Sequence, residues 1–88
     1  MSRPILVGPD IWEKLDSYDK NLKSKFIRSF RFLSRDMGHP SLRVETIKEE
    51  GCAFWRARVD LRYRFHFELL DSYYLILDIG PHRLQGIG

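Results

Sequence analysis

The fold is decided by residues 54–67, which read FWRARVDLRYRFHF. Apolar and cationic residues alternate along this stretch with a period close to two, the period of a β-strand, because successive strand side chains point to opposite faces. One face carries Trp55, Ala57, Val59, Tyr63, Phe65 and Phe67, and the other carries Arg56, Arg58, Arg62, Arg64 and His66. The pattern predicts two neighbouring strands, joined near residues 60–61, that display guanidinium groups on one side of a sheet. Such a surface suits a polyphosphate, and RNA is the ligand that we expect.

The length and composition indicate one small globular domain over residues 1–88. With 88 residues the chain has a single modest core, and 43% apolar with 31% charged residues is typical of a folded protein. No apolar run approaches the roughly 20 residues of a membrane span, and the N-terminus lacks the features of a secretory signal. The single cysteine, Cys52, excludes an internal disulfide and a multi-cysteine metal site. We therefore expect a cytoplasmic protein with no metal and no cofactor.

The net charge of +3 results from 15 basic and 12 acidic residues, so the distribution of charge matters more than the total. From residue 52 onward the acidic residues become sparse. A clustered basic surface attracts nucleic acid, and such binding weakens with salt. From charge alone, a solvated face balanced by acidic residues elsewhere remains the simpler explanation.

The first half of the chain predicts a strand and two helices. Residues 4–7 form a short strand, and Asp10 with Glu13 resembles a capping box for a helix that runs to about residue 18. A longer helix begins near residue 19 and ends before Gly38 and Pro40. Its inner face is predicted by apolar residues spaced three or four apart, which are Leu22, Phe26, Phe30, Leu33 and Met37.

The second half predicts strands at residues 42–47, 54–59, 63–70 and 73–79. Residues 48–51 form a polar turn, and residues 71–72 form a short hairpin turn. The order β-α-α-β-β-β(-β) predicts an α+β fold in which a helical hairpin packs on one face of a mainly antiparallel sheet. The opposite face, with its arginines, is left open.

This order of elements, together with the segments FWRARV, YRFHF and LDIGPH, resembles the RelE/ParE toxin superfamily of toxin–antitoxin systems. The resemblance covers nearly the whole chain and is greatest to the RelE-type ribosome-dependent mRNA endonucleases. It implies that the partners are a cognate antitoxin protein, mRNA and the ribosome. In such toxins the strand with two alternating cations, here Arg56 and Arg58, contacts the mRNA backbone.

The same resemblance assigns roles at two further positions. The arginine of the aromatic-Arg motif, here Arg64, lies near the scissile phosphate, and His82 occupies the acid–base or charge-stabilising position after the last strand. Many members also carry a C-terminal aromatic that stacks on a substrate base. This chain departs from that pattern because no aromatic follows Tyr74.

Metal-independent RNA cleavage needs a base for the 2′-hydroxyl, an acid for the leaving oxygen, and cations for the phosphorane-like transition state. Histidine exchanges protons near neutral pH, whereas arginine stays charged and binds phosphate bidentately. We therefore expect His82 to be the general acid or base, Arg64 and Arg58 to hold the phosphate, and Arg56 and Arg62 to bind the flanking backbone. The second proton-transfer group is unassigned, and His66 faces the right side of the sheet.

The long helix carries a second basic stripe, formed by Arg28, Arg31 and Arg35 at spacings of three and four. If the chain is RelE-like, we expect this stripe to contact ribosomal RNA, although a solvated outer face explains it equally well.

Structural roles are available for the other candidates too. Arg58 or Arg62 can pair with Asp60 or Glu68, and Arg64 can tie the sheet to the C-terminal segment. His66 can bond within the sheet, and His82 can be an ordinary loop residue.

Three functions are compatible with the sequence. The first is a toxin that cleaves mRNA on the ribosome. The second is a ParE-type inhibitor of DNA gyrase, and the third is a catalytically silent relative that binds an antitoxin.

Overall fold

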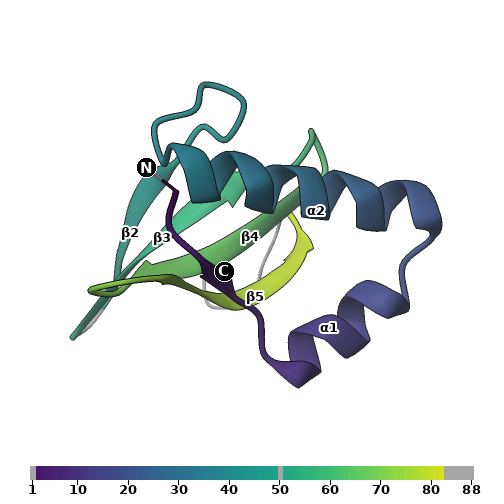
Figure 1. Cartoon of the computed structure of the whole chain (residues 1–88), viewed down its shortest axis with the longest axis horizontal. Helices are drawn as coiled ribbons and strands as arrows, with labels where there is room; N and C mark the ends of the chain where they lie inside the picture. Colours follow the sequence, from purple (N-terminus) through teal and green to yellow (C-terminus); the bar gives the residue numbers. More distant parts are fainter. Residues whose placement is uncertain (1, 50, 83–88) are drawn as a thin grey trace.

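The computed structural model describes residues 2–49 and 51–82. Its elements are β1 (Ile5–Leu6), α1 (Pro9–Asp16), α2 (Lys20–Arg35), β2 (Glu45–Glu49), β3 (Cys52–Arg58), β4 (Tyr63–Leu69) and β5 (Tyr74–Pro81). The strands form one sheet in the order β1-β5-β4-β3-β2, in which β1 pairs in parallel with β5 and the other pairs are antiparallel. Figure 1 shows α2 lying across one face of this sheet, with α1 beside β5. The predicted α+β fold is confirmed.

The start of α1 differs from the prediction. The helix begins at Pro9 with Gly8 as its N-cap, and no side chain caps it. Proline is favoured at the first helical position because its backbone angle is preset and it has no N–H to satisfy. Asp10 therefore lies in the first turn, where its charge still favours the positive end of the helix dipole. The predicted capping box is wrong.

The start of α2 is as predicted, and its end is earlier. The Asp19 carboxylate accepts the N–H of Leu22 at 2.8 Å, which caps the helix. The helix ends at Arg35 because Asp36 adopts an extended conformation and its side chain accepts the N–H of Gly38 at 2.9 Å. Met37 consequently lies outside the helix, although it still packs against the core. Neither helix in the described part of the chain has the length and hydropathy of a membrane span.

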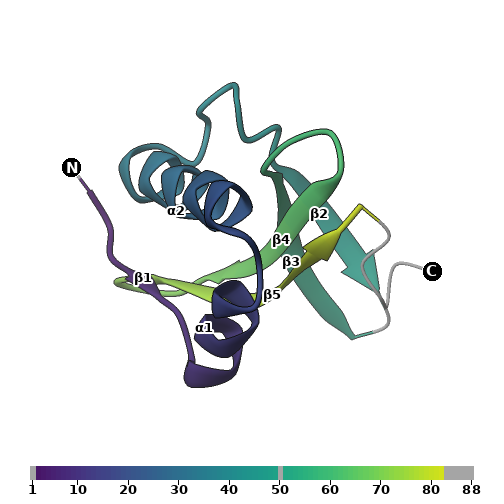
Figure 2. The same cartoon turned by 90° about the vertical axis from the view of Figure 1, so that its right-hand side faces the viewer.

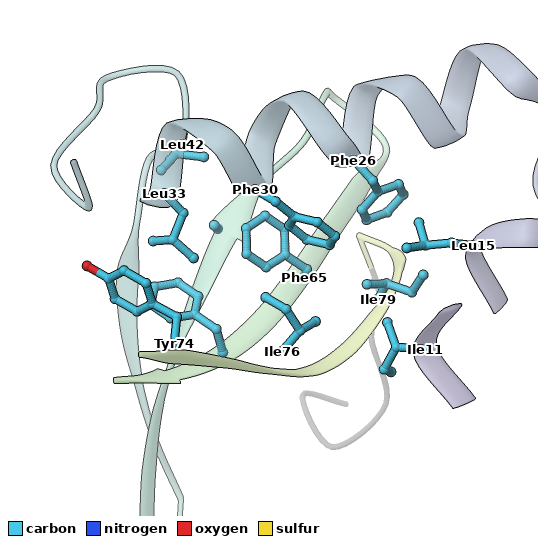
Figure 3. Packing of buried hydrophobic residues seen from close by; sticks show 12 residues of the cluster. Ile11, Leu15, Phe26, Phe30, Leu33, Leu42, Phe65, Tyr74, Ile76 and Ile79 are labelled. Carbon is cyan, nitrogen blue, oxygen red and sulfur yellow. The ribbon is translucent and has the colours of Figure 1, made fainter. Parts of the chain in front are cut away.

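The core lies between the helices and the sheet. Its buried residues are Ile11, Leu15, Phe26, Phe30, Leu33, Leu42, Ala57, Phe65, Phe67, Tyr74, Ile76 and Ile79. Figure 3 shows the inner side of α2 facing the strands, with Phe30 edge-on to Phe65 at a centroid distance of 5.0 Å. Each fully buried large side chain contributes roughly 1.5–3 kcal/mol to folding. The predicted helix stripe and the apolar face of β4 are both confirmed as core.

The predicted strand at residues 42–47 and the turn at residues 48–51 are displaced. Leu42 is fully buried, its carbonyl accepts the N–H of Arg58 at 2.6 Å, and Arg43 has a positive φ of 44°. These features keep residues 42–44 out of the ladder, so β2 runs from Glu45 to Glu49. The turn then falls later and uses the positive φ of Gly51, which glycine adopts without strain.

The pairing of β4 with β5 contains a β-bulge next to His66. His66 pairs with Asp78 and Phe67 pairs with Ile76, so Leu77 is the extra residue. The bulge lets Ile76 and Ile79 both reach the core. Asp78 is paired with His66 in the register, and its carboxylate accepts Lys14 Nζ of α1 at 3.1 Å.

Candidate nucleic-acid interface

Figure 2 shows that α2 covers one face of the sheet and leaves the other uncovered. On the uncovered face, two arginines of neighbouring strands lie directly opposite each other. Arg58 of β3 pairs with Arg64 of β4, and Arg64 pairs in turn with Gly80 of β5. Like charges in directly opposed positions destabilise a sheet, so this pair suits an anion that neutralises both. Burial lowers the pKa of the Arg64 guanidinium, and the nearby charges of Arg58 and Arg56 lower that pKa further.

Arg64 is held by backbone carbonyls rather than by a carboxylate. Its Nη1 donates to the carbonyl oxygen of Asp60 at 2.5 Å and to that of Tyr63 at 2.9 Å. Within residues 2–49 and 51–82 the side chains of Arg58 and Arg64 form no ion pair. The guanidinium of Arg64 is therefore oriented while its charge stays available to a ligand.

Asp60 organises the loop between β3 and β4. Its Oδ1 accepts the N–H groups of Arg62 and Tyr63, both at 2.8 Å, and its Oδ2 accepts Lys25 Nζ of α2 at 3.2 Å. Burial acts to raise the pKa of Asp60, but the two N–H groups and Lys25 outweigh it, so that pKa lies below its ordinary value. Asp60 thus pairs with Lys25, not with Arg58 or Arg62 as the structural alternative supposed.

Arg56 forms an ion pair with Glu45 on this face. Its Nε and Nη2 donate to Glu45 Oε1 of β2 at 2.9 and 2.6 Å, and the Arg56 side chain is only 14% exposed. Glu45 is 57% exposed and lies beside the arginine pair. Sequence reasoning gave Glu45 no role, because only the register of β2 on β3 places it opposite Arg56.

His66 is buried on this face. It pairs with Arg56 of β3 and Asp78 of β5, its ring lies 4.9 Å from that of Phe54, and only 5% of the residue is exposed. Its Nε2 has no hydrogen-bond partner within the described residues. Burial and the charge of Arg56 lower the pKa of His66, and Asp78 opposes them in part. The geometry encloses the His66 imidazole rather than exposing it to solvent.

His82 lies at the same corner of the sheet as the arginine pair. It is exposed just beyond β5, and its N–H donates to the carbonyl oxygen of Arg62 at 2.5 Å. Arg62, predicted to share the polar face with Arg64, is exposed in the bend before β4. A hollow of about 500 Å³ opens here, and Leu61, Arg62, Tyr63, Pro81 and His82 line it. The hollow thus brings Arg62 and His82 together, whereas Arg58 and Arg64 lie further along the strands and do not line it.

The basic stripe of α2 lies elsewhere. Arg28, Arg31 and Arg35 are exposed, whereas Phe26, Phe30 and Leu33 of the same helix face the sheet. The stripe therefore lies on the side of α2 that faces away from the sheet, and the sheet separates it from Arg58 and Arg64. The sequence predicted both basic groups without indicating that they lie on opposite sides of the molecule.

No group of three or more His, Cys, Asp or Glu residues able to hold a metal ion occurs in the described ranges. Opposed guanidiniums, an exposed imidazole and a held carboxylate are nonetheless the groups that phosphate binding and proton transfer require.

Solved structures of RelE and YoeB toxins share this fold of two helices packed on a mixed five-stranded sheet. The chain is similar to the archaeal RelE of a RelE–RelB complex from Pyrococcus horikoshii OT3, with a TM-score of 0.77, 20% identity, and coverage of 96% of this chain and 100% of that one. It is also similar to a YoeB/ParE toxin from Agrobacterium tumefaciens, with a TM-score of 0.74, 15% identity, and coverage of 90% and 98%. A free mutant of the E. coli toxin RelE matches with a TM-score of 0.63, 9% identity, and coverage of 99% and 90%. No protein-family model and no curated protein sequence matches the chain.

Proposed function

We propose that this protein is the toxin of a type II toxin–antitoxin system and that it cleaves mRNA on the ribosome. The observation that carries the proposal is the directly opposed pair of Arg58 and Arg64 on the uncovered face, which has no carboxylate partner within the described residues. An antitoxin partner is supported by structural neighbours that form toxin–antitoxin complexes, RelE with RelB and YoeB with YefM. Because its substrate would be translated mRNA, the protein acts in the cytoplasm.

In this proposal the 2′-hydroxyl of one nucleotide attacks the adjacent phosphorus. Arg58 and Arg64 bind the non-bridging oxygens and stabilise the charge that develops in the transition state. The products are a 2′,3′-cyclic phosphate and a 5′-hydroxyl, whose leaving oxygen takes a proton from the His82 imidazole. His82 is at the correct corner for this role because it follows directly on the segment that pairs with Tyr63 and Arg64. Arg62 binds the flanking backbone.

The base that takes the 2′-hydroxyl proton is Glu45 rather than His66. Glu45 is half-exposed, and its carboxylate is held by Arg56, whereas the Nε2 of His66 is enclosed. Arg56 and Arg58 are two residues apart on β3, so their side chains are separated by roughly 7 Å, within the span of one nucleotide. The role of Arg56 is then to position Glu45, in addition to any contact with the RNA backbone.

The basic stripe of Arg28, Arg31 and Arg35 provides a second surface for the same function. It contacts ribosomal RNA while the sheet face holds the mRNA, and positioning by the ribosome supplies part of the rate.

Primer extension on a translated reporter mRNA in a reconstituted system tests the proposal. Wild type should produce ribosome-dependent cuts. Arg64→Ala and His82→Ala should each lower cleavage by about 10²-fold or more, as removal of a phosphate clamp or a proton-transfer group does. Lys48→Ala, an exposed cation on the edge strand β2, is the matched control and should cleave normally.

Far-UV circular dichroism of each variant separates loss of chemistry from loss of fold. Intact mRNA with the wild-type protein and unaffected translation would refute the endonuclease, and a gyrase supercoiling assay would then test the ParE-type alternative.

A further inference from the structure

The guanidinium of Arg64 is held by two residues that α2 contacts in turn. Its Nη1 donates to the carbonyl oxygen of Asp60 at 2.5 Å and to that of Tyr63 at 2.9 Å. Lys25 of α2 forms an ion pair with the Asp60 carboxylate at 3.2 Å, and the next helix residue, Phe26, lies edge-on to the Tyr63 ring at a centroid distance of 6.0 Å. Both carbonyl groups that orient Arg64 therefore belong to residues that are anchored to α2.

We propose that Lys25 is a positioning residue for Arg64 and that it acts through the Asp60 carboxylate. Lys25 Nζ reaches Asp60 Oδ2 from a helix position 35 residues earlier in the chain, while Oδ1 accepts the N–H groups of Arg62 and Tyr63. One carboxylate thus joins α2 to the backbone that carries both carbonyl oxygens. The inference rests on the proposed function in one respect, because it takes a phosphate group of RNA as the ligand of Arg64.

The two anchors differ in how they hold the loop. The Tyr63 ring packs between Tyr18 and the fully buried Phe26, at centroid distances of 5.7 and 6.0 Å, so the core fixes its position. The Asp60 side chain lies outside the core and is 27% exposed, and its contact with α2 is the polar one made by Lys25. A substitution at Lys25, which is itself 48% exposed, therefore perturbs the Asp60 carbonyl while the core packing around Tyr63 stays intact.

A change in the orientation of Arg64 affects the transition state more than the ground state. The charge of Arg64 is retained when its guanidinium is turned, so electrostatic attraction of RNA to the sheet face persists. Charge that develops on the phosphate is stabilised only by donors already aimed at it. Loss of the ion pair of Lys25 should therefore lower kcat and leave KM unchanged. An exposed ion pair shifts an equilibrium by no more than about fivefold, which sets the size of the effect.

Side-chain ¹⁵N–¹H NMR of the Arg64 guanidinium tests the inference in the full chain without any RNA. Hydrogen bonds from Nη1 to two carbonyl groups slow the rotation of the guanidinium, and Arg64→Lys assigns the signals. Lys25→Met keeps the alkyl stem, removes the charge, and should speed up this rotation by about three- to fivefold, whereas Lys25→Arg should restore it. Lys23→Met is the matched control, because Lys23 lies on the same helix and pairs with Asp16 instead of the loop.

A double-mutant cycle tests whether Lys25 acts through Asp60. Asp60→Asn keeps an acceptor for the backbone N–H groups and removes the charge that pairs with Lys25. In the Asp60→Asn background, Lys25→Met should cause no further change in the rotation of the Arg64 guanidinium. Independent effects of the two substitutions would overturn the inference, as would an unchanged rotation in Lys25→Met alone.

Primer extension measures the consequence for cleavage. Lys25→Met should lower kcat by about fivefold without a change in KM for the translated mRNA, and Lys23→Met should change neither constant. A wild-type kcat in Lys25→Met, or a raised KM with kcat unchanged, would show that Lys25 does not position Arg64 for the reaction. If the wild type cleaves no mRNA, the proposed function fails, and the NMR measurement still decides whether Lys25 orients Arg64.

Discussion

Replacement of Asp60 by alanine tests how the loop between β3 and β4 is held. The carboxylate accepts hydrogen bonds from the backbone N–H groups of Arg62 and Tyr63, both at 2.8 Å, and forms an ion pair with Lys25 at 3.2 Å. The carbonyl of the same residue orients the guanidinium of Arg64. Asp60→Ala should therefore loosen the loop and Arg64 together, and should lower both the stability of the domain and any RNA cleavage.

The size of the effect follows from the contacts. Hydrogen bonds to a charged group contribute roughly 1.5–3 kcal/mol each, and an exposed ion pair less than about 1 kcal/mol. Water reaches the freed N–H groups beside the exposed Arg62, which favours the lower end, so Asp60→Ala should cost about 3 kcal/mol in the free energy of unfolding. In a domain of this size that corresponds to a fall in Tm of roughly 12–24 °C. Asp60→Asn keeps an acceptor and should cost about 1–1.5 kcal/mol, and Lys25→Ala less than about 1 kcal/mol.

Urea unfolding followed by the fluorescence of Trp12 and Trp55 measures these differences. Asp71→Ala, an exposed aspartate in the turn before β5, is the control and should change stability by less than about 0.5 kcal/mol. The contribution of Asp60 depends on pH with a defined sign: because its folded pKa is depressed, the stabilisation is full above the unfolded pKa of about 3.9 and is lost as pH falls through the folded value. If Asp60→Ala unfolds at the wild-type urea midpoint, the carboxylate does not hold the loop. The same conclusion follows if the variant remains less stable than wild type by the same free energy in acid.

Three further outcomes are expected. Burial and Arg56 depress the folded pKa of His66, so the free energy of unfolding falls as pH drops from the unfolded pKa of about 6.5 toward the folded pKa. In urea unfolding at pH 7.5 and 5.5, His66→Phe should therefore lose less stability between the two pH values than wild type. Glu45→Gln keeps an acceptor for Arg56 and should leave Tm nearly unchanged while primer extension shows cleavage lowered by about 10²-fold or more; cleavage at the wild-type rate would remove Glu45 from the mechanism. Leu33→Ala, at a fully buried site, should cost about 3 kcal/mol in chemical denaturation, and a loss under 1 kcal/mol would contradict the packing under α2.

The fold was predictable from sequence where periodicity and burial act together. The alternation at residues 54–67 and the apolar stripe of α2 each satisfy one geometric period, and both appear as predicted. The errors fall at element ends, where a local contact decides the outcome. Pro9 begins α1 because of its ring, and Leu42 leaves the strand because its side chain is an anchor in the core. Such contacts depend on tertiary structure, so the secondary-structure preferences of single residues do not predict them.

The candidate site was predictable in composition but not in its pairing. Alternation placed Arg56, Arg58 and Arg64 on one face, yet it gave no reason to separate Arg56 from the other two. Cross-strand register makes that separation, because it sets Glu45 opposite Arg56 and sets Arg58 opposite Arg64. Register in turn depends on where β2 begins, which the backbone of residues 42–44 determines. Sequence reasoning missed Glu45, and the signal that could have indicated it is an acidic residue in the strand before two alternating arginines.

The two basic surfaces have a consequence for the proposed contacts with RNA. Arg58 and Arg64 lie on one side of the sheet, and Arg28, Arg31 and Arg35 lie on the outer side of α2, with a layer of buried side chains between them. A helix packs at about 10 Å from its neighbour, so a single extended strand of RNA on the sheet face does not reach the outer stripe. Two separate polyanions are needed to neutralise both surfaces, as a ribosome and its mRNA provide. Charge reversal of Arg28 and Arg31 should therefore weaken binding to ribosomes and leave the affinity for a short RNA unchanged, whereas Arg58→Ala should weaken the short RNA; if all three substitutions weakened the same probe equally, the two surfaces would be one site.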